Sequence, residues 1–292
     1  MSLLSERAVL AGLHVGFWTG TMHDREVSDE TAERHKADSK DSGKYTKQLV
    51  SKKALHHVGS HVSAARRAHK LLTLPWDDLG TRILSNRGYV GYTEQMKLRR
   101  HAVEAAAHEF CTNYDSYINE AKTRLGSMFS QEDYPAAEDV RRKFYIDVEI
   151  KPVPEAADFR AQLSDDSVRA IVKDIETRTE ARLQAAVNDV FERIADVTGK
   201  MVERLRAYKP SEGGGRPENT FKDSLVYNVQ ELADLIPALN ITQDPRLDAL
   251  QQRLLNELAG QSPDLLRYDD RLRAKTADAA EKILKKVQGF IS

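Results

Sequence analysis

Residues 164–208 read SDDSVRAIVKDIETRTEARLQAAVNDVFERIADVTGKMVERLRAY. Apolar side chains recur here every three or four residues, which is the spacing of one face of an α-helix. The stripe consists of Val168, Ile171, Ile175, Leu183, Ala186, Val190, Ile194, Val197, Met201 and Leu205. With Ser164 as its cap, the pattern predicts a helix of some forty residues. A helix far longer than the usual ~11 or 12 residues is typical of a coiled-coil arm or the spine of a bundle.

The sequence that follows this helix predicts a linker and a set of shorter helices. Residues 209–219, KPSEGGGRPEN, are rich in Gly and Pro and indicate a flexible linker. Three helices are expected after it, and their starts are marked by Thr220 and Asp223, by Asp244 with Pro245, and by Ser262 with Pro263. Gly289 is expected to end the last of them. The C-terminal part is therefore predicted to be an antiparallel bundle.

The N-terminal part contains strand patterns as well as helical ones. Apolar and other residues alternate in residues 13–18 and most clearly in residues 144–151, FYIDVEIK. Residues 158–163, DFRAQL, are expected to pair with that second strand. In residues 82–92, RILSNRGYVGY, a turn at Asn86–Gly88 is expected to join two short strands.

Helical patterns separate these predicted strands. Ser28 is expected to start one helix, and residues 51–72 predict an amphipathic helix that ends before Pro75. A longer helix is expected from about Thr93 to Leu125, closed by Gly126. The fold class is therefore a mostly α-helical α+β protein, with a small antiparallel sheet embedded among helices and a long-helix bundle after it. The expected domains are residues 1–163, with the basic segment 44–101, and residues 164–292.

Composition excludes several classes of protein. The chain has 292 residues, 40% of them hydrophobic, 30% charged, and no apolar run of the ~20 residues that cross a bilayer. The first 18 residues include Glu6, Arg7 and His14 and do not resemble a signal peptide, so a cytoplasmic location is expected. The only cysteine, Cys111, cannot form an intramolecular disulfide or a zinc site built on several thiolates.

Motifs of known enzyme chemistry are not found in the sequence. The glycines at 213–215 are followed by Arg216 and Pro217, which is not the sequence of a phosphate-binding loop. His57 and His61 have a spacing that can hold a metal, but no metalloprotease glutamate stands between them. Cys111 is expected to be a buried apolar side chain. We therefore expect no catalytic residues, no metal and no cofactor.

The charge is distributed unevenly along the chain. Residues 44–101 contain twelve Lys or Arg, five His and only three acids, a net charge of +9, whereas the whole chain has a net charge of -1. The rest of the chain must therefore sum to -10. A basic segment of this kind is typical of nucleic-acid binding, because clustered Lys and Arg neutralise phosphates.

The basic segment provides two kinds of candidate site residue. Phosphate contacts are expected from Lys52, Lys53, Arg66, Arg67 and Lys70, extended by Arg82, Arg87, Arg99 and Arg100. Bases are expected to stack on Trp76, Tyr89 or Tyr92, because single strands bind to flat side chains beside positive charge. This combination favours sequence-independent binding of nucleic acid, with single-stranded DNA preferred, by a protein that is not an enzyme.

Two alternatives remain open. The positive face can pair with the acidic half of the same molecule or of a neighbour, or can simply be solvated. Alternatively, the long helix can pack against copies of itself or against a partner, which makes the protein a homo-oligomer or an adaptor.

Five motifs resemble an uncharacterised family of phage and proteobacterial proteins over residues 10–250 or so. The motifs are GFWTG at 16–20, TLPWDDLGTRIL at 73–84, YPAAED at 134–139, PVPEAADFR at 152–160 and PALNITQDP at 237–245. Members of that family are often encoded near MoxR-type AAA+ ATPases and chelatase-like partners, or among replication and recombination genes. The resemblance implies a phage-encoded cytoplasmic accessory to DNA metabolism or to such an ATPase, and it assigns no catalytic residue.

Overall fold

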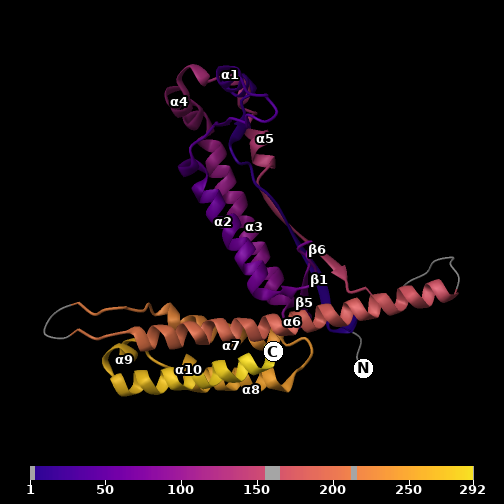
Figure 1. Cartoon of the computed structure of the whole chain (residues 1–292), viewed down its shortest axis with the longest axis vertical. Helices are drawn as coiled ribbons and strands as arrows, with labels where there is room; N and C mark the ends of the chain where they lie inside the picture. Colours follow the sequence, from indigo (N-terminus) through magenta and orange to yellow (C-terminus); the bar gives the residue numbers. More distant parts are fainter. Residues whose placement is uncertain (1–3, 155–164, 212–215, 292) are drawn as a thin grey trace. The chain divides into compact units, whose positions relative to one another are not determined.

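The computed structural model describes residues 4–154, 165–211 and 216–291. It is rich in helix and has a small antiparallel sheet, which confirms the expected fold class (Figure 1). The chain forms two compact units that do not follow a single boundary in the sequence. Unit 1 contains Met1–Gly12, Lys70–Tyr92 and Ile150–Ser292, and unit 2 contains Leu13–His69 and Thr93–Glu149. Two N-terminal segments, Met1–Gly12 and Lys70–Tyr92, therefore belong to the same unit as the C-terminal helices.

The main sheet has the strand order β4-β5-β1-β6. Strand β1 (Ala8–Gly16) pairs with β5 (Arg82–Ser85) in antiparallel register, from Ala8 opposite Ser85 to Ala11 opposite Arg82. Strand β4 (Leu74–Pro75) lies at one edge and β6 (Tyr145–Pro152) at the other. The strand expected at residues 144–151 is therefore confirmed, and it pairs with β1. The partner expected at residues 158–163 lies outside the described residues.

A hairpin was expected around Asn86–Gly88, and the prediction of its second strand is wrong. Residues after Gly88 form the start of α3 (Tyr89–Thr112), and the Tyr92 N–H donates to the Gly88 carbonyl at 2.9 Å. An apolar run as short as YVGY has no period long enough to distinguish strand from helix. The single helix expected to reach Leu125 is also divided, because α4 (Tyr114–Leu125) begins after Asn113. The Asn113 amide donates to the Glu109 carbonyl at 2.9 Å, which competes with the regular helical hydrogen bonds.

Unit 2 is built around helices α2 and α3, which lie side by side in Figure 1. Helix α2 is Lys52–Leu72, which confirms the amphipathic helix expected there. The shorter elements of this unit are α1 (Arg25–His35), α5 (Ala137–Arg142), and a two-stranded antiparallel sheet of β2 (Thr21–His23) and β3 (Thr46–Gln48). Asp24 caps α1 through the Val27 N–H at 3.2 Å, so the start expected at Ser28 is wrong.

Aromatic side chains form much of the core of unit 2. The Trp18 ring contacts those of Phe110 and Tyr114 edge-on, at centroid distances of 6.0 and 5.9 Å. The Phe144 ring contacts those of Phe110 and Phe17 at 5.6 and 5.5 Å. These contacts join the segment that follows β1, helices α3 and α4, and the residue that precedes β6, and edge-to-face rings add to the free energy of apolar burial.

Gly16 sits where β1 passes a neighbouring segment too closely for a side chain. A Cβ atom there would lie 2.2 Å from Tyr145 Cε1 and 2.7 Å from the Lys143 carbonyl oxygen. We expect Gly16→Ala to lower the free energy of unfolding by about 1–3 kcal/mol, because the backbone has to shift to admit the methyl group. Gly91→Ala is the control, since nothing lies within 4 Å of a Cβ there, and it should not destabilise α3. Urea unfolding of both variants measures the difference.

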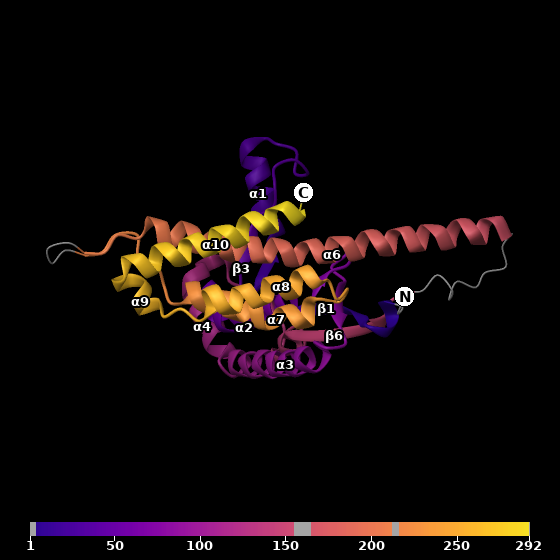
Figure 2. The same cartoon turned by 90° about the horizontal axis from the view of Figure 1, so that it is seen from below.

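Unit 1 is a helical bundle around α6 (Asp165–Ala207), whose length matches the expectation. Helix α10 (Asp270–Ile291) packs along the C-terminal half of α6, as Figure 2 shows. The two helices run antiparallel, because Phe191 contacts Phe290 at 5.4 Å and Arg206 pairs with Glu281. The remaining elements are α7 (Ser224–Leu239), α8 (Pro245–Arg253), a π-helical turn (Leu254–Ala259) and α9 (Pro263–Tyr268).

The last helix expected in this bundle is divided in the structure. It was expected to start at Ser262 and end at Gly289, but α9 ends at Tyr268 and α10 begins at Asp270. The Asp269 carboxylate accepts the Leu272 N–H at 2.9 Å, which starts the second helix. Helix α10 then continues through Gly289 to Ile291.

Candidate nucleic-acid interface

Helix α2 presents one continuous face to solvent, and this face carries no acid. The helix buries Leu55, Val58, Val62 and Ala65 on its other side. Its exposed residues are Lys52, Lys53, His56, His57, Ser60, Ser63, Arg66, Arg67 and Lys70. From Lys52 to Lys70 the helix rises about 27 Å, so the cations are spread along an extended surface. We call Lys52, Lys53, Arg66, Arg67 and Lys70 the α2 cations.

Of the α2 cations, Lys70 belongs to unit 1 and the other four belong to unit 2. None of the five forms an ion pair with a described carboxylate of its own unit. The local reason is that α2 contains no Asp or Glu, so no partner exists three or four residues away. Helix α6 is different, because Asp174 and Asp189 pair with Arg178 and Arg193 four residues further on. The α2 cations therefore keep charge that an anionic ligand could neutralise.

Arg82 and Arg193 hold the C-terminal end of α2. The Arg193 guanidinium donates to the carbonyls of Lys70, Leu71 and Thr73 at 2.9, 2.8 and 2.8 Å. Arg82 donates to the Thr73 hydroxyl at 2.7 Å and to the Thr73 carbonyl at 2.9 Å. These bonds satisfy carbonyls that the helix itself leaves without a donor.

Arg82 therefore has a structural role that differs from the expected phosphate contact. Burial lowers the pKa of its guanidinium, the neighbouring Arg193 lowers it further, and Asp189 opposes both effects. Arg193 was not among the candidate residues. No local pattern marks it, because its partners lie some 120 residues earlier in the chain.

The other three predicted arginines differ in their surroundings. Arg100 donates to Asp147 at 2.9 Å, so its charge is already paired within unit 2. Arg99 is partly exposed, and Arg87 is exposed on the turn that leads into α3.

Two of the three predicted stacking rings are buried. Trp76 is 4% exposed and Tyr92 is 0% exposed, so neither ring has a face open to a base. The Arg182 guanidinium covers the Trp76 ring at 5.5 Å from its centroid. Burial raises the pKa of Tyr92. Tyr89, at 40% exposed, is the ring of the three that reaches the surface.

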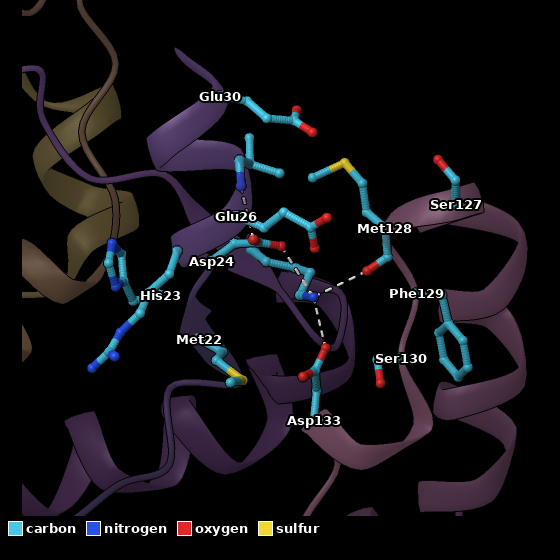
Figure 3. A pocket seen from close by; sticks show the side chains of 13 residues that line it. Met22, His23, Asp24, Glu26, Glu30, Ser127, Met128, Phe129, Ser130 and Asp133 are labelled. Carbon is cyan, nitrogen blue, oxygen red and sulfur yellow. Dashed lines mark hydrogen bonds and ion pairs between the residues drawn. The ribbon is translucent and has the colours of Figure 1, made fainter. Parts of the chain in front are cut away.

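Lys47 belongs to the basic segment but lies in a buried ion cluster. Its ammonium contacts Asp133 at 2.6 Å, Asp24 at 3.2 Å and the Met128 carbonyl oxygen at 3.0 Å. Figure 3 shows Asp24, Asp133 and Met128 converging on one point at a cleft of about 850 Å³. The side chains of Lys47, Asp24 and Asp133 are 7%, 12% and 13% exposed. We call these three residues the Lys47 cluster.

The Lys47 cluster connects β3, the start of α1 and the turn at Gln131–Asp133. Burial lowers the pKa of Lys47, but the hydrogen bonds to Asp133 and Asp24 outweigh it and leave that pKa raised. The Val27 N–H holds the pKa of Asp24 low, against burial and together with Lys47. All three ammonium hydrogens have acceptors, so Lys47 is not available as a nucleophile. Sequence reasoning missed this cluster, since its members are far apart in the chain.

The motifs that carry the family resemblance coincide with turns and packing positions. In TLPWDDLGTRIL, the Asp77 carboxylate accepts the N–H groups of Leu79 and Thr81 at 3.0 and 2.9 Å. In PALNITQDP, the Asn240 side chain accepts the Asp244 N–H at 2.8 Å and shapes the turn into α8. Side chains in these two motifs therefore shape turns, and PVPEAADFR lies mostly outside the described residues.

No family model, curated protein or solved structure matches this chain. In the described part of the chain, no group of three or more His, Cys, Asp and Glu residues is placed to hold a metal ion. None of the described helices is both long enough and apolar enough to cross a membrane.

Proposed function

We propose that the protein binds nucleic acid through phosphate contacts made by the exposed face of α2. The observation that carries the proposal is the set of five α2 cations on an acid-free face, each without an ion pair to a described carboxylate of its own unit. An ion pair within its unit would offset the attraction of each cation for phosphate, and none of the described carboxylates of that unit forms one with it.

Several features favour binding that does not depend on base sequence. Lys and Arg contact phosphates without reading bases, and recognition of a base edge needs side chains placed in a groove. Because Trp76 and Tyr92 are buried, Tyr89 is the remaining one of the three candidate rings on which a base could stack. Phosphate contacts therefore supply most of the proposed affinity. A preference for single strands would then depend on Tyr89.

Charge reversal on α2 tests this function. We expect Arg66→Glu with Arg67→Glu to lower the affinity for a labelled DNA oligonucleotide at least about tenfold, because phosphate contacts become repulsive. The slope of log affinity against log salt should become shallower by about one for each phosphate contact removed. Filter binding at two salt concentrations, with single-stranded and duplex probes, measures both quantities.

The matched control places the same change of charge on another helix. Arg271 and Lys286 are exposed on α10, so Arg271→Glu with Lys286→Glu changes the net charge equally. That variant should retain DNA nearly as the wild type does. If the α2 variant keeps its helical circular dichroism and its DNA affinity, the proposed function is wrong. Absence of wild-type binding at low salt would also contradict it.

A further inference from the structure

The N-terminal half of α6 has an apolar stripe that the bundle does not cover. Residues 165–185, which we call the arm, extend beyond α7, α8 and α10 in both Figure 1 and Figure 2. Among the described residues, the hydrophobic core includes α6 side chains only from Ala186 onward. Val168, Val172, Ile175 and Thr179 follow a three- and four-residue spacing along the arm, and all four are partly exposed.

A helical segment of this kind needs packing for its stability. Helices in proteins depend mostly on burial of an amphipathic face and less on the intrinsic propensity of their residues. The stripe continues along α6 to Ala186 and Val190, which are buried in the hydrophobic core of the bundle. We propose that a second copy of this chain covers the arm, with the two arms antiparallel. This inference goes beyond nucleic-acid binding and does not depend on it.

Charge selects one register for this pairing. If the two-fold axis passes between Lys173 and Asp174, Val172 lies opposite Ile175 of the second copy and Val168 lies opposite Thr179. Beside this apolar seam, Arg169 lies next to Glu176 of the second copy, and the two-fold axis repeats the contact on the other chain. We call these two contacts the flanking pairs. At each end, Asp165 lies level with Arg182 of the second copy. Every close charged pair in this register is attractive, over an overlap of about 27 Å.

The neighbouring registers and the parallel arrangement bring like charges together. A shift of one heptad in one direction places Arg169 beside Arg169 of the second copy. A shift in the other direction places Glu176 beside Glu176, and Arg178 beside Arg178. If the two arms were parallel and in register, Arg182 would lie beside Arg182 of the second copy. Like charges at facing positions disfavour these alternatives, so the antiparallel register with Arg169 facing Glu176 is the one we infer.

The side chains that this register uses are accessible. Arg169 is 72% exposed and pairs with Asp166 on its own helix. Glu176 is exposed and has no ion pair with a described residue of its unit. Arg182 is the exception, since it lies over the Trp76 ring and is only partly exposed. The flanking pairs therefore give the most direct test.

Light scattering after size-exclusion chromatography tests the pairing. We expect the wild type to have about twice the 32.9 kDa mass of one chain. Arg169→Glu alone and Glu176→Arg alone should each weaken dimerisation on the order of tenfold, because both flanking pairs become repulsive. The double variant R169E/E176R recreates both pairs and should dimerise as the wild type does. An equimolar mixture of the two single variants should do the same.

Glu180→Arg is the control for charge reversal. It changes an exposed residue of the arm that lies outside the flanking positions, so it should leave the mass unchanged. A wild type that stays monomeric at tens of micromolar concentration overturns the proposal, and would leave the stripe to a different partner. Single variants that dimerise like the wild type overturn the register.

Disulfide trapping checks the register independently. In a Cys111→Ser background, Val168→Cys with Thr179→Cys places two thiols opposite each other in the antiparallel dimer. A disulfide needs Cα atoms about 4.4–6.8 Å apart, which residues eleven positions apart on one helix cannot provide. Oxidation should therefore give a covalent dimer, while Val168→Cys with Ile175→Cys should remain mostly uncrosslinked. The reverse result overturns the proposed register.

Discussion

Replacing Lys47 with methionine is expected to lower the free energy of unfolding by about 3–5 kcal/mol. The substitution keeps a long side chain but leaves the carboxylates of Asp24 and Asp133 buried without their shared cation. These carboxylates are only 12% and 13% exposed, so water replaces little of the lost interaction. Urea unfolding at neutral pH, followed by circular dichroism, measures the loss.

Lowering the pH should reduce the difference in free energy of unfolding between the wild type and Lys47→Met. In the wild type the pKa of Asp24 is lowered on folding, so its contribution is present above the unfolded pKa near 3.8 and is lost as pH falls through the folded pKa. Without Lys47, Asp24 loses one of the interactions that hold its pKa low, while the larger one, the Val27 N–H, remains, so its folded pKa moves back toward the unfolded value. The variant then loses less stability than the wild type as pH falls, and the difference between them becomes smaller.

Two further variants control for the Lys47 prediction. Adding Asp24→Asn and Asp133→Asn to Lys47→Met should recover most of the stability, because asparagine removes the unpaired charge and still caps α1. Lys44→Met, at an exposed position three residues away, should change the stability by less than about 0.5 kcal/mol. A loss below about 1 kcal/mol in Lys47→Met would mean that the cluster does not stabilise unit 2.

Replacing Arg193 with methionine is expected to cost about 2–4 kcal/mol and to loosen the end of α2. The variant removes the hydrogen bonds to the carbonyls of Lys70, Leu71 and Thr73, together with the 2.7 Å ion pair to Asp189. A bond from a charged donor is worth about 1.5–3 kcal/mol, and an unsatisfied buried acceptor adds a penalty. Amide hydrogen exchange in the last turn of α2 should become faster than in its first half.

Arg193→Lys separates charge from geometry at this position. A lysine keeps the positive charge but cannot reach several carbonyls with a rigid fork, so it should recover less than half of the loss. Arg178→Met is the control, since that arginine forms an exposed pair with Asp174 on the same helix. It should cost less than about 0.5 kcal/mol. Equal exchange rates along α2 in Arg193→Met would contradict the role given to Arg193.

Much of the secondary structure could be predicted because it depends on local periodicity. The stripe from Val168 to Leu205 predicts α6, and Leu55, Val58, Val62 and Ala65 predict α2. Boundaries were less predictable, since Asp24 and not Ser28 caps α1, and YVGY starts α3. Short segments allow more than one structure, and tertiary hydrogen bonds decide between them.

The charged residues show the limit of the sequence most clearly. Lys47, Arg82 and Arg100 are cations of the same basic segment as Arg66, yet Lys47 and Arg100 pair with carboxylates and Arg82 caps carbonyls. Nothing local distinguishes these side chains, because the partner of Lys47 at Asp133 and that of Arg100 at Asp147 are distant in the chain. The sequence predicts where the positive charge is concentrated but not which charges stay unpaired.

By itself, the sequence determined the helical class, the long spine and the amphipathic character of α2, because the geometry of a helix converts spacing directly into faces. Only the tertiary structure decided that Trp76 and Tyr92 are buried, that Lys47 is held by two carboxylates, and that the arm lies outside the bundle. Burial and pairing join residues that are far apart in the chain, and no local pattern encodes such contacts.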